Sequence, residues 1–211
     1  MWGHNARVLG VVHYRTLDRQ GVRCLGKAKG IRLATLNIRL GRAGGLEAAL
    51  RDLRQGNVDV GVLQETKLTD SIHVCQVEGY FLWVTKAENR HWGVVAVVWR
   101  EDARWQVEGI FNFGPNVESF LLTLGSQRWY VVGAYVPPHG MSDVHHIKQD
   151  LEEAPKRMEV ILLGDLSVRL REPWDEREDE IVSTLVGSGL VNVITYFMPR
   201  RRYKGTRSWT W

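Results

Sequence analysis

The stretch that most constrains the fold runs from Val160 to Leu170 and reads VILLGDLSVRL. Its apolar residues end at Gly164, which is typical of a buried strand that reaches a tight turn, and Asp165 follows at once. The strand therefore brings a carboxylate to its carboxyl end, the edge of an open α/β sheet where ligands and catalytic groups collect. Because Gly-Asp is also a common turn pair, the alternative is that Asp165 only turns the chain.

The amino-terminal part of the chain alternates between strand and helix. Ile31–Leu36 alternates like a strand, and Asn37 follows it in the position that Asp165 takes later. Leucines at helical spacing predict a helix from Leu46 to Gln55. Val58–Leu63 is predicted as a second strand, with Glu65 just beyond its end. Strands separated by helices are typical of α/β proteins.

The middle of the chain changes to consecutive strands, which indicates antiparallel or mixed pairing. Helices are predicted at Ser142–Lys156 and around Asp175–Glu180, the latter ending at Gly187 or Gly189. The economical interpretation is one domain over residues 31–211, in which mixed sheets are flanked by helices, with residues 1–30 as a leader or linker. The predicted strands of the middle part are Tyr80–Val84, Val94–Trp99, Trp105–Phe113, Ser119–Leu124 and Trp129–Tyr135, and Ser208–Trp211 is predicted as a further strand.

Composition and charge narrow the class of protein. The 211 residues are 44% hydrophobic and 25% charged, as in ordinary globular proteins. No apolar run is long enough to cross a bilayer, and two cysteines are too few for a disulfide framework, so an intracellular protein without a membrane partner is expected. Residues 1–30 carry a net charge of +5 and residues 199–211 also +5, which leaves −6 for the middle. Basic ends suit a polyanion such as nucleic acid, although solvated tails would look the same.

Four predicted strands are followed by, or end in, a polar side chain: Asn37, Glu65, Tyr135 and Asp165. Two acids among amide and hydroxyl groups suit Mg²⁺, which takes oxygen ligands and keeps several waters beside one or two carboxylates. Such a metal neutralises phosphate charge and helps present a water for in-line attack. If the four side chains converge, the pattern therefore predicts a magnesium-dependent phosphodiesterase.

Four motifs in this order and spacing resemble those of the endonuclease/exonuclease/phosphatase superfamily: TLNIR (Thr35–Arg39), LQETK (Leu63–Lys67), GAYVPP (Gly133–Pro138) and GDLS (Gly164–Ser167). Within it, residues 30–211 are most similar to the endonuclease domain of non-LTR retrotransposons, which nicks target DNA to prime reverse transcription. The resemblance implies a four-layer α/β sandwich, with two mixed sheets face to face and helices outside. It also implies Mg²⁺, with Mn²⁺ as a substitute, a DNA substrate, a reverse transcriptase region as partner, and a nuclear location.

The resemblance also implies a role for each matching residue. Asn37 would hold phosphate or a metal-bound water, and Glu65 would be the principal metal ligand. Tyr135 would contact the scissile phosphate, and Asp165 would orient or activate the attacking water. The family usually has Asn two positions after this Asp, where this chain has Ser167, whose hydroxyl has a shorter reach than an amide.

A second departure concerns the carboxyl end. The family's remaining Asp and its late Asp-His pair follow the Trp-Thr-Trp strand, and this sequence stops at Trp211. We therefore expect the chain to be an amino-terminal portion of the domain that carries only part of the metal and phosphate site. Two other classes stay open: a non-catalytic remnant that binds nucleic acid or protein, and a phosphatase that acts on a small or lipid phosphate.

Other clusters have simpler interpretations. The basic run Arg200, Arg201, Arg202 and Lys204, interrupted by Tyr203, is a candidate for gripping the DNA backbone, with a solvated loop as the alternative. His145 and His146 would point in different directions on a helix, which favours a polar helix over a zinc site that also uses His139. The tryptophans at predicted strands are expected in the core rather than as base-stacking platforms: Trp83, Trp99, Trp105 and Trp129.

Overall fold

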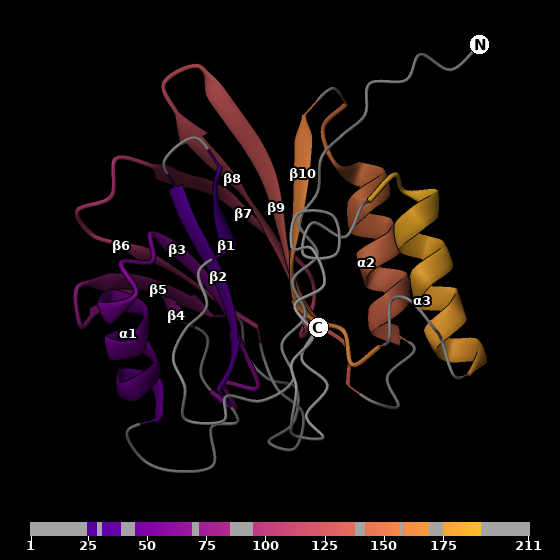
Figure 1. Cartoon of the computed structure of the whole chain (residues 1–211), viewed down its shortest axis with the longest axis horizontal. Coiled ribbons are helices and arrows are strands. Elements are labelled where there is room, and N and C mark those ends of the chain that lie inside the picture. The colour runs from indigo at the N-terminus through magenta and orange to yellow at the C-terminus, as the bar shows by residue number, and fades with distance from the viewer. Residues whose placement is uncertain are drawn as a thin grey trace, which may run out of the picture.

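The structure is a computed structural model that describes residues 25–28, 31–38, 45–68, 72–84, 95–137, 142–156, 158–168 and 175–190. Within these residues the chain forms ten strands in two sheets and three helices (Figure 1). Both sheets are mixed, and each contains one parallel pair of neighbouring strands. These two parallel pairs position the candidate site.

The first sheet has six strands in the order β1-β2-β3-β6-β5-β4. Only β2 and β3 are parallel, and they are joined through a helix as parallel strands require. All five residues of β3 are buried, so this strand reads as a continuous apolar run rather than as an alternating one. The strands are β1 (Leu25–Ala28), β2 (Ile31–Asn37), β3 (Val60–Gln64), β4 (Ile72–Val77), β5 (Tyr80–Val84) and β6 (Ala96–Arg100).

The second sheet has four strands in the order β10-β9-β8-β7. The strands β9 and β10 are parallel and pair without interruption from Trp129 and Glu159 to Tyr135 and Asp165. The remaining neighbours are antiparallel and are joined by tight turns. The strands are β7 (Gln106–Gly114), β8 (Val117–Leu124), β9 (Gln127–Tyr135) and β10 (Glu159–Asp165).

Three apolar clusters hold four layers together. One lies between the two sheets, and it includes Trp105 and Trp129 with Trp83 and Trp99 packed against it, so the prediction of core tryptophans is confirmed. The second lies between the first sheet and α1 (Gly45–Gln55). The third lies between the second sheet and the pair α2 (Ser142–Glu153) and α3 (Glu176–Gly187). Figure 1 shows α1 on one side of the molecule and α2 and α3 on the other, so the predicted sandwich with outer helices is confirmed.

The structure differs from the sequence interpretation at three places. β1 pairs with β2, although it lies in the segment interpreted as a leader. β4 was not predicted, because its sequence IHVCQV places His, Cys and Gln among its apolar residues. Gly164 does not form a turn; it lies inside β10, where an added Cβ would be 2.0 Å from the carbonyl oxygen of Ala134. Glycine is required there because β9 and β10 approach each other closely.

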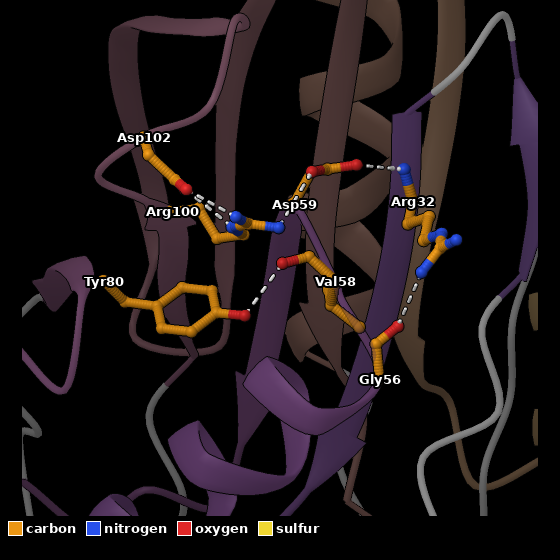
Figure 2. Close-up of polar contacts among 7 residues, drawn as sticks. All are labelled: Arg32, Gly56, Val58, Asp59, Tyr80, Arg100 and Asp102. Carbon is orange, nitrogen blue, oxygen red and sulfur yellow. Dashed lines mark hydrogen bonds and ion pairs between the residues drawn. The ribbon is translucent and has the colours of Figure 1, made fainter.

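A polar network fastens the end of the first sheet that lies opposite the exits of β2 and β3 (Figure 2). The carboxylate of Asp59 accepts a hydrogen bond of 2.7 Å from the backbone N–H of Arg32 and lies 3.9 Å from the guanidinium of Arg100. Tyr80 donates its hydroxyl proton to the carbonyl of Val58 at 2.8 Å. The strands β2, β3, β5 and β6 are therefore tied together at this end, and the loops at the other end are left for the site.

Candidate active site

The ends of the two parallel strand pairs lie together, with Asn37 and Glu65 from the first sheet beside Asp165 from the second. We call this edge of the molecule the mouth. In the first sheet Asn37 is opposite Gln64, the last residue of β3. In the second sheet Tyr135 is opposite Asp165, and each is the last residue of its strand. Neighbouring parallel strands end at the same edge of a sheet, so the parallel pairing places the last residues of the two strands side by side. The packing of the two sheets then brings the pairs to each other.

The side chain of Asn37 joins the two sheets. Its amide nitrogen donates to Oε1 of Glu65 at 2.8 Å and to Oδ2 of Asp165 at 2.9 Å. Asn37 is 6% exposed and Asp165 is 4% exposed, so their bond is buried, whereas the bond to Glu65 is part-buried. An amide carries two N–H donors, and here each of them serves a different carboxylate. The prediction that Asn37, Glu65 and Asp165 lie at one mouth of the fold is confirmed.

Glu65 is held by the residues on both sides of it. Gln64 and Thr66 are fully buried, and Gln64 donates to the hydroxyl of Thr35 at 2.7 Å. Glu65 itself has a φ of 53°, in the left-handed region that side chains other than glycine rarely adopt. Strained backbone of this kind is concentrated at functional sites. The loop therefore presents the Glu65 carboxylate in one fixed direction.

Tyr135 forms the second link between the sheets. Its hydroxyl donates to Oε1 of Glu65 at 2.9 Å, the same oxygen that Asn37 contacts. The ring is 4% exposed and packs in the apolar cluster between the sheets. The backbone N–H of Tyr135 donates to the carbonyl of Asn116 at 2.9 Å, which fixes the end of β9. The phenol is thus both packed and aimed at the carboxylates.

Asp165 both turns the chain and faces the site. Its Oδ1 accepts from the backbone N–H of Ser167 at 3.0 Å, while Oδ2 accepts from Asn37. The two interpretations of this residue from sequence are therefore compatible, because each describes one carboxylate oxygen. Ser167 has a φ of 47°, and its hydroxyl lies 3.5 Å from Oδ1 of Asp165. The serine contributes mainly through its backbone.

The donor set of the site suits a hard divalent cation. Its groups are two carboxylates, an amide, a phenol and a hydroxyl, without sulfur or imidazole among the described residues that meet there. Across the described part of the chain, no group of three or more His, Cys, Asp or Glu is placed to hold a metal. Mg²⁺ fits such a site because it keeps several waters and takes one or two carboxylates, whereas structural zinc takes four nitrogen or sulfur ligands.

Sequence reasoning missed Arg177 in the first turn of α3. Its guanidinium donates to the carbonyls of Pro137 and Ser167, which lie two residues beyond the ends of β9 and β10. The sequence does contain a signal for it: a lone Arg among acidic residues in the first turn of a helix is unfavourable next to the helix dipole, which indicates a partner outside the helix.

The other residues that the sequence offered as candidates either lie elsewhere in the described part of the chain or fall outside it. His145 is exposed on α2, and the ring of His146 lies beside Gly114. His139 and the basic run Arg200, Arg201, Arg202 and Lys204 lie outside the described residues. No helix in the described part of the chain is long and apolar enough to cross a membrane.

Solved structures share this architecture. The endonuclease domain of TRAS1, a telomere-specific non-LTR retrotransposon, superposes with a TM-score of 0.59 at 16% identity, covering 75% of this chain and 70% of that one. An AP endonuclease from Archaeoglobus fulgidus gives 0.56 at 15% identity, with 74% and 70% covered. The 3′ phosphatase NExo from Neisseria, bound to product DNA hairpin, gives 0.52 at 16% identity, with 74% and 70% covered. At such identities the likeness shows the fold.

Sequence comparison adds the family. Among curated proteins none matches this chain. Residues 34–211, however, match the endonuclease/exonuclease/phosphatase family, and that range contains each strand end that meets at the candidate site. The chain therefore belongs to the endonuclease/exonuclease/phosphatase family.

Proposed function

We propose that the chain is a Mg²⁺-dependent endonuclease domain of retroelement type that hydrolyses a phosphodiester bond of DNA. The observation that carries the proposal is the pair of carboxylates, Glu65 and Asp165, held on one amide nitrogen of Asn37 at the mouth between the sheets. The likeness to the TRAS1 endonuclease domain and to the Neisseria 3′ phosphatase bound to a DNA hairpin supports DNA as the substrate. Such a domain would work in the nucleus beside a reverse transcriptase region.

Each site residue has a proposed task. Glu65 would be the principal ligand of the metal. Asn37 would assist it, with its amide oxygen accepting from a metal-bound water or an amide N–H donating to the phosphate. Asp165 would orient the attacking water and accept its proton, since its carboxylate is fixed by Asn37 and by the N–H of Ser167. Tyr135 would donate its hydroxyl proton to a phosphate oxygen in place of its present acceptor, Glu65. A bound Mg²⁺ supplies Lewis-acid stabilisation of the phosphate charge.

Plasmid nicking tests the proposal. Supercoiled DNA is incubated with the chain and Mg²⁺, with EDTA as the metal-free arm, and the rate of conversion to open circles is measured. Asp165→Asn and Glu65→Gln should each slow nicking by about 10²-fold or more, because charge placed at a reaction centre contributes at least that much. The exposed α1 carboxylate in Asp52→Asn and the exposed α2 carboxylate in Glu152→Gln are matched controls that should nick like the parent.

The assay also separates the other classes. Nicking by Asp165→Asn at the parent rate would show that the roles are wrong. Release of phosphate from a 3′-phosphorylated oligonucleotide without nicking of intact duplex would show a phosphatase, the activity named for the Neisseria neighbour. In a second arm the chain is extended beyond Trp211 by a family-like carboxyl-terminal segment. Absence of nicking by both proteins, while DNA is still bound, would favour the non-catalytic remnant.

The basic run of residues 200–204 is proposed to bind the DNA backbone. Changing Arg200, Arg201 and Arg202 together to Gln should weaken DNA binding. It should also flatten the plot of log affinity against log salt by about 0.9 for each phosphate that the variant no longer neutralises. Fluorescence anisotropy with labelled duplex between low and moderate salt measures this slope. An unchanged slope would favour the solvated loop.

A further inference from the structure

Arg177 occupies a position that its own helix does not favour. It is the single basic residue of α3, and its neighbours in the first turn are Glu176, Glu178 and Asp179. The amino-terminal end of a helix carries partial positive charge, so an arginine there is destabilising by itself. A contact outside the helix can offset this cost.

That contact is a pair of backbone carbonyls at the candidate site. Nη2 of Arg177 donates to the carbonyl of Pro137 at 2.8 Å, and Nη1 donates to the carbonyl of Ser167 at 3.4 Å. Pro137 lies two residues after the end of β9, and Ser167 lies two residues after the end of β10. One planar guanidinium thus joins the exits of the two parallel strands. Arginine suits this task because its N–H donors have fixed directions.

The contact between Arg177 and Ser167 is linked to the Asp165 carboxylate through one further hydrogen bond. Ser167 has a left-handed backbone, and its N–H donates to Oδ1 of Asp165 at 3.0 Å. The carbonyl and the N–H of Ser167 belong to adjacent peptide units that meet at the Ser167 Cα. If the carbonyl is released, the backbone on its side of this Cα loses a restraint, and the N–H can then move away from Asp165. On the other side, Pro137 follows Tyr135, whose hydroxyl faces Glu65. Movement of either exit would thus change the direction of a side chain of the site.

We infer that Arg177 is a positioning residue, which holds the Asp165 carboxylate and the Tyr135 phenol in place by tying the exits of β9 and β10. The inference rests on the proposed function of these two side chains. The surroundings agree with a cation here: burial raises the pKa of Asp143, and the positive charge of Arg177 is among the influences that oppose that rise. Arg177 itself contacts no carboxylate of the site, so it acts through the backbone.

The first test needs no catalytic activity. Amide hydrogen exchange at Ser167 is measured by NMR in the parent, in Arg177→Gln and in Arg177→Lys, with Arg51→Gln on the exposed face of α1 as the control for loss of one charge. Exchange at Ser167 should accelerate about tenfold or more in Arg177→Gln, because hydrogen bonds from a charged donor are lost. The exchange rate at Ser167 in Arg177→Lys should lie between those of the parent and of Arg177→Gln. Exchange in the centre of β9, for example at Val131, should not change.

The second test measures nicking well below the unfolding temperature. Arg177→Gln should lower kcat about tenfold or more and leave KM like that of Arg51→Gln, since small misplacements of reacting groups have effects of this size. Arg177→Lys should recover part of kcat. A role in stability alone would instead lower the unfolding temperature and leave kcat unchanged at low temperature.

The outcomes of the two tests are separable. Unchanged exchange at Ser167 in Arg177→Gln overturns the inference, whether or not the parent nicks DNA. Changed exchange with an unchanged kcat also overturns it, because Arg177 then restrains the loop without serving the reaction. If neither the parent nor the extended chain hydrolyses a phosphodiester, the proposed function is contradicted, and the restraint on Asp165 is then judged by exchange alone.

Discussion

At the scale of single residues, one amide group decides the geometry of the site. Asn37 directs one N–H to Glu65 and the other to Asp165, and these acids belong to different sheets. Two carboxylates brought this close would repel each other without a shared donor or cation.

Ser167 is the residue where a family-like change should improve the site. Its φ of 47° lies in the left-handed region, which Asn adopts more readily than Ser. Ser167→Asn should therefore raise the free energy of unfolding by up to about 1 kcal/mol. It should also speed nicking, because an amide reaches farther than a hydroxyl. Chemical denaturation and the nicking assay measure both effects, with Ser167→Ala as the control. A less stable Asn variant would contradict this account of position 167.

The site residues could be recognised from sequence because each directly follows, or ends, an apolar strand. Asn37, Glu65, Tyr135 and Asp165 all share that signal. Arg177 could not be recognised in the same way, because its partners are backbone carbonyls that the sequence does not mark. The bond between Gln64 and Thr35 was missed because it joins two buried neutral side chains inside the sheet.

At the scale of elements, the close pairing of β9 with β10 sets the position of Asp165. The strands pair in register over their shared length, and Gly164 is the point of closest approach to Ala134. The sequence located this strand but assigned its glycine to a turn, because close approach between strands leaves no trace in local pattern. β1 and β4 were missed since neither shows an uninterrupted apolar alternation. The strands β3 and β9, whose apolar residues are adjacent in sequence, were found.

Gly164→Ala tests the importance of this pairing. The added Cβ would meet backbone atoms of Ala134, which cannot move aside as a flexible side chain can. The free energy of unfolding should fall by about 3 kcal/mol or more, at or above the upper end of usual overpacking costs. Gly187→Ala is the matched control, because nothing lies within 4 Å of its Cβ position and alanine favours the helix. Equal stability of the two variants in urea would refute the close-approach explanation.

The contact of α2 with the second sheet contains a buried acid that should give the fold a pH dependence. Asp150 is fully buried and accepts from the hydroxyl of Tyr130, which also contacts Ser119. Burial raises the pKa of Asp150 from 3.8 to about 6, with the nearby Glu153 adding to the rise and the two hydroxyls opposing it. Folding therefore favours the protonated form. Its contribution to stability is present in full below pH 3.8 and is lost as the pH rises through about 6.

Asp150→Asn should remove this dependence. The stability of the parent relative to the variant should fall by about 2.5 kcal/mol between pH 4 and pH 8, because the pKa of Asp150 is 3.8 in the unfolded chain and about 6 in the folded one. Urea denaturation at several pH values measures it. Asp143, whose pKa is also raised by burial, titrates in both proteins and so cancels in the difference. A constant difference across this pH range would show that Asp150 is not protonated in the native protein near pH 5.

At the scale of the whole molecule, a structural network and the candidate site lie at opposite ends of the strands. The network of Asp59, Arg100 and Tyr80 ties one end of the first sheet (Figure 2), and the side chains of the site join both sheets at the exits of the parallel strands. The four layers were predictable from strand order together with the family resemblance. The joining of the sheets through Asn37 depends on packing between residues 128 positions apart, which no local pattern encodes.

A double-variant cycle in the nicking assay tests most directly whether Glu65 and Asp165 serve one reaction centre. The rates of Glu65→Gln, Asp165→Asn and the double variant are compared with that of the parent. Groups that act as a unit are strongly non-additive, so the double variant should lose about as much rate as the worse single variant. Losses that multiply would mean that the two carboxylates act independently, which would contradict a single site at this mouth of the fold.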